Sequence, residues 1–190
     1  MKRITLAETT HFIIKEHLQA GDIAIDATLG NGHDCLFLAE CVGSTGHVYG
    51  FDIQTQALES TRQRLHDLNA APVTLIRANH ADMRHYIPEA EQGHISAIMF
   101  NLGYLPGTDK SIMTQTQTTL QAIEVACDLL ASQGLVTVMA YPGHAGGDEE
   151  TRSLQAWVQN VEFKRFSVET HFSQHHQESA PRLFVIRKLT

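Results

Sequence analysis

The chain has few cysteines, and none of its apolar runs is long enough to cross a membrane. Three cysteines stand among 190 residues without paired spacing, at Cys35, Cys41 and Cys127. This pattern argues against a disulfide framework and is typical of a reducing compartment. No run of about 18 apolar residues occurs, and charged residues interrupt the first segment, which argues against a membrane span and a secretory signal. We therefore expect a cytoplasmic protein without a membrane partner.

The chain also lacks an excess of basic residues and a metal-binding motif. Lys and Arg number 14 against 21 Asp and Glu, so the formal net charge is −7. That balance excludes a strongly basic nucleic-acid binder but leaves room for a local basic patch. The 12 histidines are scattered without H-E-x-x-H spacing, so no metal site is expected. Basic residues gather in three places, at Lys2, Arg3, Lys15, Lys110, Lys164, Arg165, Arg182, Arg187 and Lys188.

A regular alternation of apolar patterns is present. The hydrophobic share of 43% and the charged share of 18% suit one globular domain over residues 1–190. Strand-like runs alternate with helical patterns, which predicts an α/β fold with a mainly parallel seven-stranded sheet and helices on both faces. Strands are expected over 22–27, 47–51, 73–77, 96–101, 135–141, 163–170 and 183–188. Helices are expected over 5–19, 34–42, 55–68 and 114–131, with another carrying Leu154, Trp157, Val158 and Val161.

A glycine-containing segment follows the first expected strand and leads into a helix. It reads DATLGNGHD over residues 26–34. Ligands of open α/β sheets bind beyond the carboxyl ends of the strands, and glycines let a backbone turn approach a ligand closely. The segment is therefore a candidate cofactor loop, with the candidate residues Asp26, Gly30, Asn31, Gly32, His33 and Asp34.

A second acidic residue ends the next expected strand. Asp52 stands in the sequence FDIQ, and its carboxylate can accept hydrogen bonds from both hydroxyls of a ribose. Gln54 would then lie near an adenine. The alternative is that Asp52 caps the helix expected to start at Thr55.

The charge of the loop distinguishes two nucleoside cofactors. NAD sites use G-x-G-x-x-G, but the sixth position here is Cys35. A pyrophosphate favours the positive end of a helix, whereas Asp26 and Asp34 surround this helix start with negative charge. Those acids suit a ligand that bears an ammonium and a sulfonium. The sequence therefore favours S-adenosylmethionine over NAD.

A further loop follows the fourth expected strand and reads FNLGYLPGTDK over residues 100–110. Its start resembles the N-P-P-Y loop of amino-group methyltransferases, in which an amide oxygen and a backbone carbonyl accept hydrogen bonds from the nitrogen to be methylated. Leu102 and Gly103 stand where two prolines would be. Asn101 and Tyr104 are the candidate catalytic residues. The alternative is that Asn101 caps the turn and Tyr104 packs.

Taken together, these segments resemble one bacterial family. The motifs are DATLGNGHD, FDIQ, Asn79-His80, FNLGYLPG and the YPGH of residues 141–144. They are similar to proteins once labelled rRNA methylases, members of which methylate the aminomethyl group of 5-aminomethyl-2-thiouridine at the tRNA wobble position. The resemblance implies a Rossmann-like class I methyltransferase fold, S-adenosylmethionine as donor, S-adenosylhomocysteine as product and a tRNA anticodon stem-loop as partner.

The resemblance also implies roles for particular residues. It assigns the donor to Asn31, His33, Asp34, Asp52, Gln54 and His80, and the acceptor amine to Asn101 and Tyr104. His144 would lie on the rim, and Lys110 lies at the end of the loop over residues 100–110, where it could meet an anticodon phosphate. Three alternatives stay open: methylation of rRNA, methylation of a small-molecule amine, and a non-catalytic S-adenosylmethionine-binding module. The sequence does not give the oligomeric state, and a homodimer is one option.

Overall fold

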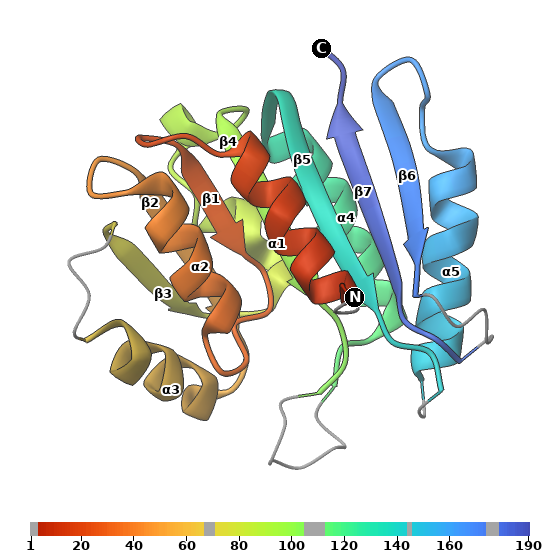
Figure 1. Cartoon of the computed structure of the whole chain (residues 1–190), viewed down its shortest axis with the longest axis horizontal. Coiled ribbons are helices and arrows are strands. Elements are labelled where there is room, and N and C mark those ends of the chain that lie inside the picture. The colour runs from red at the N-terminus through yellow and green to blue at the C-terminus, as the bar shows by residue number, and fades with distance from the viewer. Residues whose placement is uncertain (1–3, 67–70, 105–112, 144–145, 174–178) are drawn as a thin grey trace.

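The computed structural model describes residues 4–66, 71–104, 113–143, 146–173 and 179–190 (Figure 1). Its centre is a seven-stranded sheet of order β3-β2-β1-β4-β5-β7-β6. The strands are β1 (Ile23–Asp26), β2 (His47–Asp52), β3 (Val73–Arg77), β4 (Ile95–Asn101), β5 (Leu130–Ala140), β6 (Phe166–Phe172) and β7 (Arg182–Lys188). The first five pair in parallel, and β7 pairs antiparallel with both β5 and β6. The predicted mainly parallel sheet is confirmed.

Helices cover both faces of this sheet, as predicted, and β1, β2, β4, β5 and β7 have consecutive buried residues, so both faces of these strands are covered. On one face lie α1 (Leu6–His17), α2 (His33–Val42) and α3 (Thr55–Leu65), and on the other lie α4 (Thr116–Leu129) and α5 (Gly147–Asn160) (Figure 1). Two short 3-10 helices, η1 (His80–His85) and η2 (Glu89–Glu91), follow β3. Each face has its own apolar core, one around Leu38 and Val48 and the other around Phe51, Phe100 and Phe184.

The junction between α4 and β5 differs from the sequence prediction. A helix over 114–131 and a strand from 135 were expected, but the helix ends at Leu129 and strand pairing starts at Leu130. Leu130 is fully buried and pairs with Ile95, and the register then shifts before Leu135 pairs with Ala97. Gln133 takes a left-handed φ of 65° within this irregular stretch. Burial of Leu130 against β4 therefore outweighs the continuous helical pattern.

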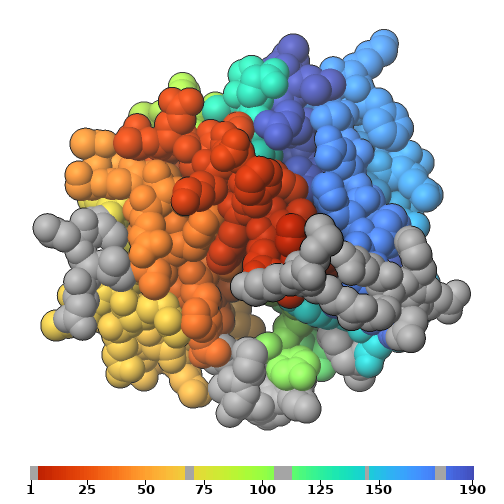
Figure 2. Space-filling view, in the orientation of Figure 1, coloured from red at the N-terminus to blue at the C-terminus, as the bar shows by residue number. Residues whose placement is uncertain are grey.

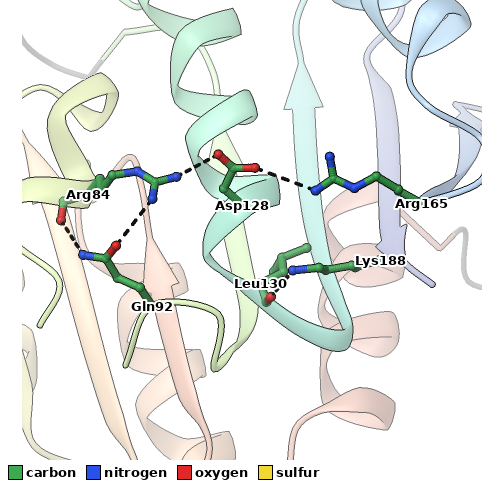
Figure 3. Close-up of polar contacts among 6 residues, drawn as sticks. All are labelled: Arg84, Gln92, Asp128, Leu130, Arg165 and Lys188. Carbon is green, nitrogen blue, oxygen red and sulfur yellow. Dashed lines mark hydrogen bonds and ion pairs between the residues drawn. The ribbon is translucent and has the colours of Figure 1, made fainter. Parts of the chain in front are cut away.

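A polar cluster joins several elements at the amino ends of the parallel strands (Figure 3). Asp128, near the end of α4, accepts a hydrogen bond of 2.8 Å from Arg84 of η1 and lies 3.9 Å from Arg165. Lys188 of β7 donates to the carbonyl of Leu130 over 2.6 Å. The cations therefore neutralise the negative end of the α4 dipole. Arg165 and Lys188, two candidates for a basic patch, are engaged here.

Candidate functional site

The main cavity lies where the strand order reverses. Successive strands proceed from β1 toward β3 on one side and from β4 toward β5 on the other, so the carboxyl ends of β1 and β4 diverge. A cavity of about 760 Å³ opens there, lined by the segments that follow β1, β2, β3, β4 and β5. Figure 2 shows this end of the molecule hollowed between the orange atoms around α2 and the green atoms that follow β4. A volume of this size suits a nucleoside-sized ligand.

The glycines of the loop after β1 allow it to turn tightly beneath the cavity. Gly30 and Gly32 have φ angles of 51° and 76°, in the region that favours glycine. Gly30 lines the cavity, whereas Gly32 is not among the lining residues and is the N-cap residue of α2. A Cβ on Gly32 would stand 2.6 Å from Oγ1 and 2.8 Å from Cα of the buried Thr61. Gly32 therefore brings the cofactor loop against α3.

Asp26 lies beneath the cavity and does not line it. Its carboxyl is buried, with Oδ1 accepting a hydrogen bond from the backbone N–H of Thr28 over 3.1 Å. Oδ2 has no hydrogen-bond partner in the described part of the chain. Burial, with Asp34 and Asp52 nearby, raises the pKa of Asp26 well above its usual value. Asp26 thus shapes the loop from behind.

Asp52 joins two of the segments that line the cavity. Its Oδ2 accepts a hydrogen bond from Gly30 N–H over 3.0 Å, and its Oδ1 accepts one from Gln54 N–H over 2.9 Å. Burial raises the pKa of the carboxyl. The residue at the N-cap position of α3 is Gln54 rather than Asp52. Asp52 and Gln54 both line the cavity, as the cofactor prediction requires.

A basic residue that the sequence did not suggest contacts the cofactor loop. Arg64 of α3 donates from Nε to the carbonyl of Asn31 over 2.9 Å, and its Nη2 lies 3.2 Å from His33 Nε2. Asn31 and His33 both line the cavity. Arg64 stands 31 residues after His33 with no motif linking them, so no sequence signal pointed to this contact.

A histidine of the first helix contacts the acid at the start of α2. Nε2 of His11 lies 2.7 Å from Oδ1 of Asp34, and the His11 ring stacks on Phe37 with centroids 3.9 Å apart. Asp34 lines the cavity. Asp34 was predicted to contact the ligand, whereas His11 was not among the predicted site residues, because α1 and α2 meet only in the fold. One oxygen of Asp34 is therefore engaged by the protein.

His80 is a buried histidine at the wall of the cavity. It is 8% exposed, lines the cavity, and has Nδ1 3.2 Å from the carbonyl of Ala27. Burial lowers the pKa of His80 to about 4. A neutral ring that donates from Nδ1 has an acceptor lone pair on Nε2, and Nε2 has no partner among the described residues. The orphaned acceptor fits a ligand that brings an N–H or O–H group.

Burial of neutral His80 makes stability depend on pH. The unfolded chain takes up this proton below about pH 6.5, whereas the folded protein resists it down to about pH 4. Acidification across that window should therefore cost about 3 kcal/mol of unfolding free energy through this residue. Urea unfolding of the wild type and of His80→Gln should show the difference between them shrinking by this amount from pH 7 to pH 4. The exposed His94, changed to Gln, serves as the control, and an equal change there would contradict the assignment.

The two candidate catalytic residues flank the end of β4. Asn101 is exposed and lines the cavity, and its backbone N–H donates to Oγ1 of Thr28 over 2.7 Å. Tyr104 also lines the cavity and pairs with Met113 through a β-bridge. The structure therefore brings Asn101 and Tyr104 to the same cavity as the cofactor loop. Lys110 and His144, the two predicted substrate contacts, lie outside the described residues.

A buried acid anchors Thr114, which in turn contacts the segment that follows β4. Glu150 of α5 is 5% exposed and accepts hydrogen bonds from Thr114 over 2.9 Å and Thr119 over 2.6 Å. Thr114 in turn accepts a hydrogen bond from Gly103 N–H over 3.0 Å. Glu150 was not among the predicted site residues, because in the sequence it is one of three acids in the first turn of a helix, where acids are ordinarily exposed.

Membrane-spanning helices and metal clusters are absent from the described part of the chain. No helix in residues 4–66, 71–104, 113–143, 146–173 and 179–190 is long and apolar enough to cross a bilayer. The same residues contain no group of three or more His, Cys, Asp or Glu side chains arranged to hold a metal ion.

The sheet order, the glycine loop and the cavity at the strand reversal define the class: a Rossmann-like fold of the S-adenosylmethionine-dependent methyltransferases. Residues 48–187 match the family model described as "Putative rRNA methylase". A solved structure from Clostridium thermocellum with that same description is 39% identical, with a TM-score of 0.91, over 100% of this chain and 99% of the other. The chain belongs to this rRNA methylase family.

Two further relatives have a named activity or a bound ligand. A Streptococcus mutans methyltransferase homologue, solved in complex with S-adenosylhomocysteine, is 36% identical with a TM-score of 0.84, over 100% of this chain and 99% of that one. The chloroplastic tRNA (mnm5s2U34)-methyltransferase of Arabidopsis thaliana is 38% identical over 159 residues, which is 79% of this chain. The chain spans 57% of the length of the Arabidopsis protein.

Proposed function

We propose that this protein transfers a methyl group from S-adenosylmethionine to an RNA amine, namely the aminomethyl group of a modified wobble uridine in tRNA. The observation that carries the proposal is a cavity lined on one side by Asp34, Asp52 and His80 and on the other by Asn101 and Tyr104. The Streptococcus mutans complex supports the donor, and the Arabidopsis relative supports the acceptor.

The donor side of the cavity has groups that match each part of the ligand. When bound, S-adenosylmethionine supplies a methyl group activated on a sulfonium. Asp52 can accept hydrogen bonds from the ribose hydroxyls, and Asp34 can hold the ammonium of the methionine part. The Nε2 lone pair of His80 accepts an N–H or O–H of the ligand. Asn31, His33 and Gln54 complete the donor contacts along the cavity wall.

The acceptor side must handle an amine that begins protonated. Alkyl amines resemble lysine, with a pKa of about 10.4, so the attacking nitrogen must lose a proton. A cationic donor nearby favours that loss, because like charges disfavour the protonated form. Asn101 Oδ1 then accepts an N–H of the free amine and directs its lone pair, with Tyr104 at the same wall. The proton lost before attack goes to solvent. As the methyl–nitrogen bond forms, the methyl–sulfur bond breaks, which leaves a secondary ammonium and neutral S-adenosylhomocysteine sulfur, and positioning supplies much of the rate.

The cysteines favour nitrogen over carbon as the methyl acceptor. Methylation of a pyrimidine carbon commonly uses a cysteine nucleophile. Cys35 and Cys127 are buried on α2 and α4, where burial raises the pKa of both thiols. No cysteine is among the described residues that line the cavity.

A second candidate substrate is ribosomal RNA. The small-subunit rRNA methyltransferase H of Dictyoglomus thermophilum is 32% identical over 104 residues, covering 54% of this chain and 33% of that protein. Lys110 and His144 are proposed to contact the RNA in either case, on sequence grounds alone. Mass spectrometry of nucleosides from a strain lacking the gene distinguishes the two substrates. We expect 5-aminomethyl-2-thiouridine to accumulate in tRNA; a methyl group missing from rRNA instead would refute the tRNA assignment.

Loss of the Asp52 carboxylate should weaken donor binding. Asp52→Ala is expected to raise the dissociation constant for S-adenosylhomocysteine by about 10- to 150-fold, equivalent to roughly 1.5–3 kcal/mol for hydrogen bonds to a charged group. Titration calorimetry measures the change, and NAD should give no heat with either protein.

The matched control for this variant is Asp22→Ala. Asp22 also accepts a backbone hydrogen bond, from Gln19 N–H over 2.8 Å. It directly precedes β1, however, and so lies at the amino ends of the parallel strands, away from the cavity. It should bind S-adenosylhomocysteine like the wild type. Wild-type affinity in Asp52→Ala would remove Asp52 from the ribose site.

A further inference from the structure

The direction of β7 separates the basic residues of the last part of the chain. Arg187 and Lys188 end β7 at the amino ends of the parallel strands, where Arg187 donates to the carbonyl of Gln133 over 3.3 Å. Arg182 begins β7 and pairs with Ala140, the last residue of β5. The next residue, Tyr141, lines the cavity. Arg182 therefore lies at the end of the sheet where the parallel strands have their carboxyl ends and where the cavity opens.

Arg182 lies beside an exposed aromatic ring at this end of the sheet. It pairs in register with Phe172, the last residue of β6, and its Cζ is 6.0 Å from the centroid of the Phe172 ring. Nη1 of Arg182 donates to Oε1 of Gln155 on α5 over 2.6 Å, which holds the guanidinium in place. Phe172 is 51% exposed. In Figure 1, the adjoining ends of β6 and β7 lie at the same end of the sheet as the segments that follow β4 and β5.

An exposed phenylalanine beside a fixed guanidinium has the chemistry that binds unpaired bases. Bases released from a helix stack on aromatic rings and on arginine planes, and every base offers a π-face. Such stacking needs few phosphate contacts, which suits a chain with a net charge of −7. Three strand spacings separate β4 from β6, or about 14 Å, which is the length of about four stacked nucleotides.

We propose that Phe172 and Arg182 form a stacking platform for an unpaired base of the RNA substrate, close to the nucleotide whose amine enters the cavity. This inference rests on the proposed function, since it requires an RNA substrate. The platform binds RNA independently of the donor, because neither residue lines the cavity.

The test is the binding of a fluorescent anticodon stem-loop RNA to the full chain saturated with S-adenosylhomocysteine. Phe172→Ala and Phe172→Leu should both weaken RNA binding by about 5- to 100-fold, since leucine keeps apolar volume without a π-face. Phe172→Trp should restore it. The slope of affinity against salt concentration should stay unchanged in all three variants, because stacking neutralises no phosphate.

Phe163→Ala provides the matched control. Phe163 is 64% exposed and precedes β6, beyond the end that pairs with Lys188, so its loss should leave RNA affinity unchanged. Calorimetry with S-adenosylhomocysteine checks that every variant is folded. Wild-type RNA affinity in Phe172→Leu, or equal losses in the Phe172 and Phe163 variants, would overturn the platform alone. A wild-type protein that binds S-adenosylhomocysteine but no RNA would overturn the proposed function and the platform with it.

Discussion

Asn101→Ala should lower the turnover number for RNA methylation by about 100-fold while leaving the affinity for S-adenosylhomocysteine unchanged. The side-chain oxygen is expected to orient the lone pair of the amine, and misplacement of a reacting atom by about 1 Å can cost that much rate. The backbone of Asn101 is held separately by Thr28, so the substitution should keep the local fold. Single-turnover methyl transfer from a radiolabelled donor measures the effect.

Two further variants sharpen this experiment. Asn101→Asp keeps an acceptor oxygen but adds a negative charge, which favours the protonated amine. Its activity should therefore recover only at higher pH. Asn160→Ala, at the end of α5, removes an exposed side chain whose Nδ2 donates to the carbonyl of Ala156, and it should turn over normally. Unchanged turnover in Asn101→Ala would leave Asn101 as a turn residue only.

Gly32→Ala should lower the free energy of unfolding by about 2–5 kcal/mol. Its φ of 76° is a left-handed conformation that costs an alanine about 1–2 kcal/mol. The new Cβ would also stand 2.8 Å from Cα of Thr61, so α3 must shift, and forcing extra volume into a packed interior costs about 1–3 kcal/mol. Urea unfolding followed by circular dichroism gives the difference.

Gly93→Ala separates the two contributions. Gly93 has a similar φ of 82°, but a Cβ there would meet nothing within 4 Å. This variant should lose only the conformational part, about 1–2 kcal/mol. If both variants lost the same stability, the close approach of the cofactor loop to α3 would carry no energetic weight.

The order of the elements was predictable because each has a local signature. Apolar runs bounded by glycines mark the parallel strands, and the period of about 3.6 marks the helices between them. The position of the loop after β1 was predictable for the same reason, since Asp26, Gly30 and Gly32 lie within one segment that follows a strand. Asp52 could be paired with that loop because parallel strands end at one edge of a sheet.

The contacts that support the site were not predictable, because they join residues far apart in the chain. Asp34 meets His11 across 23 positions, and Thr114 meets Glu150 across 36. Neither pair has a characteristic spacing, and a glutamate in the first turn of a helix is ordinarily exposed.

The basic patch could not be located from the sequence for a different reason. In the sequence, Arg182 lies close to Arg187 and Lys188. In the structure these residues lie at opposite ends of β7, which is seven residues long. Arg182 lies at the end of β7 nearest the cavity. Arg187 and Lys188 lie at the other end, where they contact the backbone carbonyls of Gln133 and Leu130.

The pairing of Gly103 with Thr114 makes the wall of the cavity insensitive to the length of chain between these two residues. Gly103 and Thr114 are held together by a backbone hydrogen bond of 2.9 Å, and Thr114 is anchored in turn to the buried Glu150. Lengthening a connection whose two ends are fixed costs little free energy, since the cost grows only with the logarithm of its length. Relatives of this chain can therefore differ in length between Gly103 and Thr114 at little cost in stability, while Asn101 keeps its place at the cavity wall.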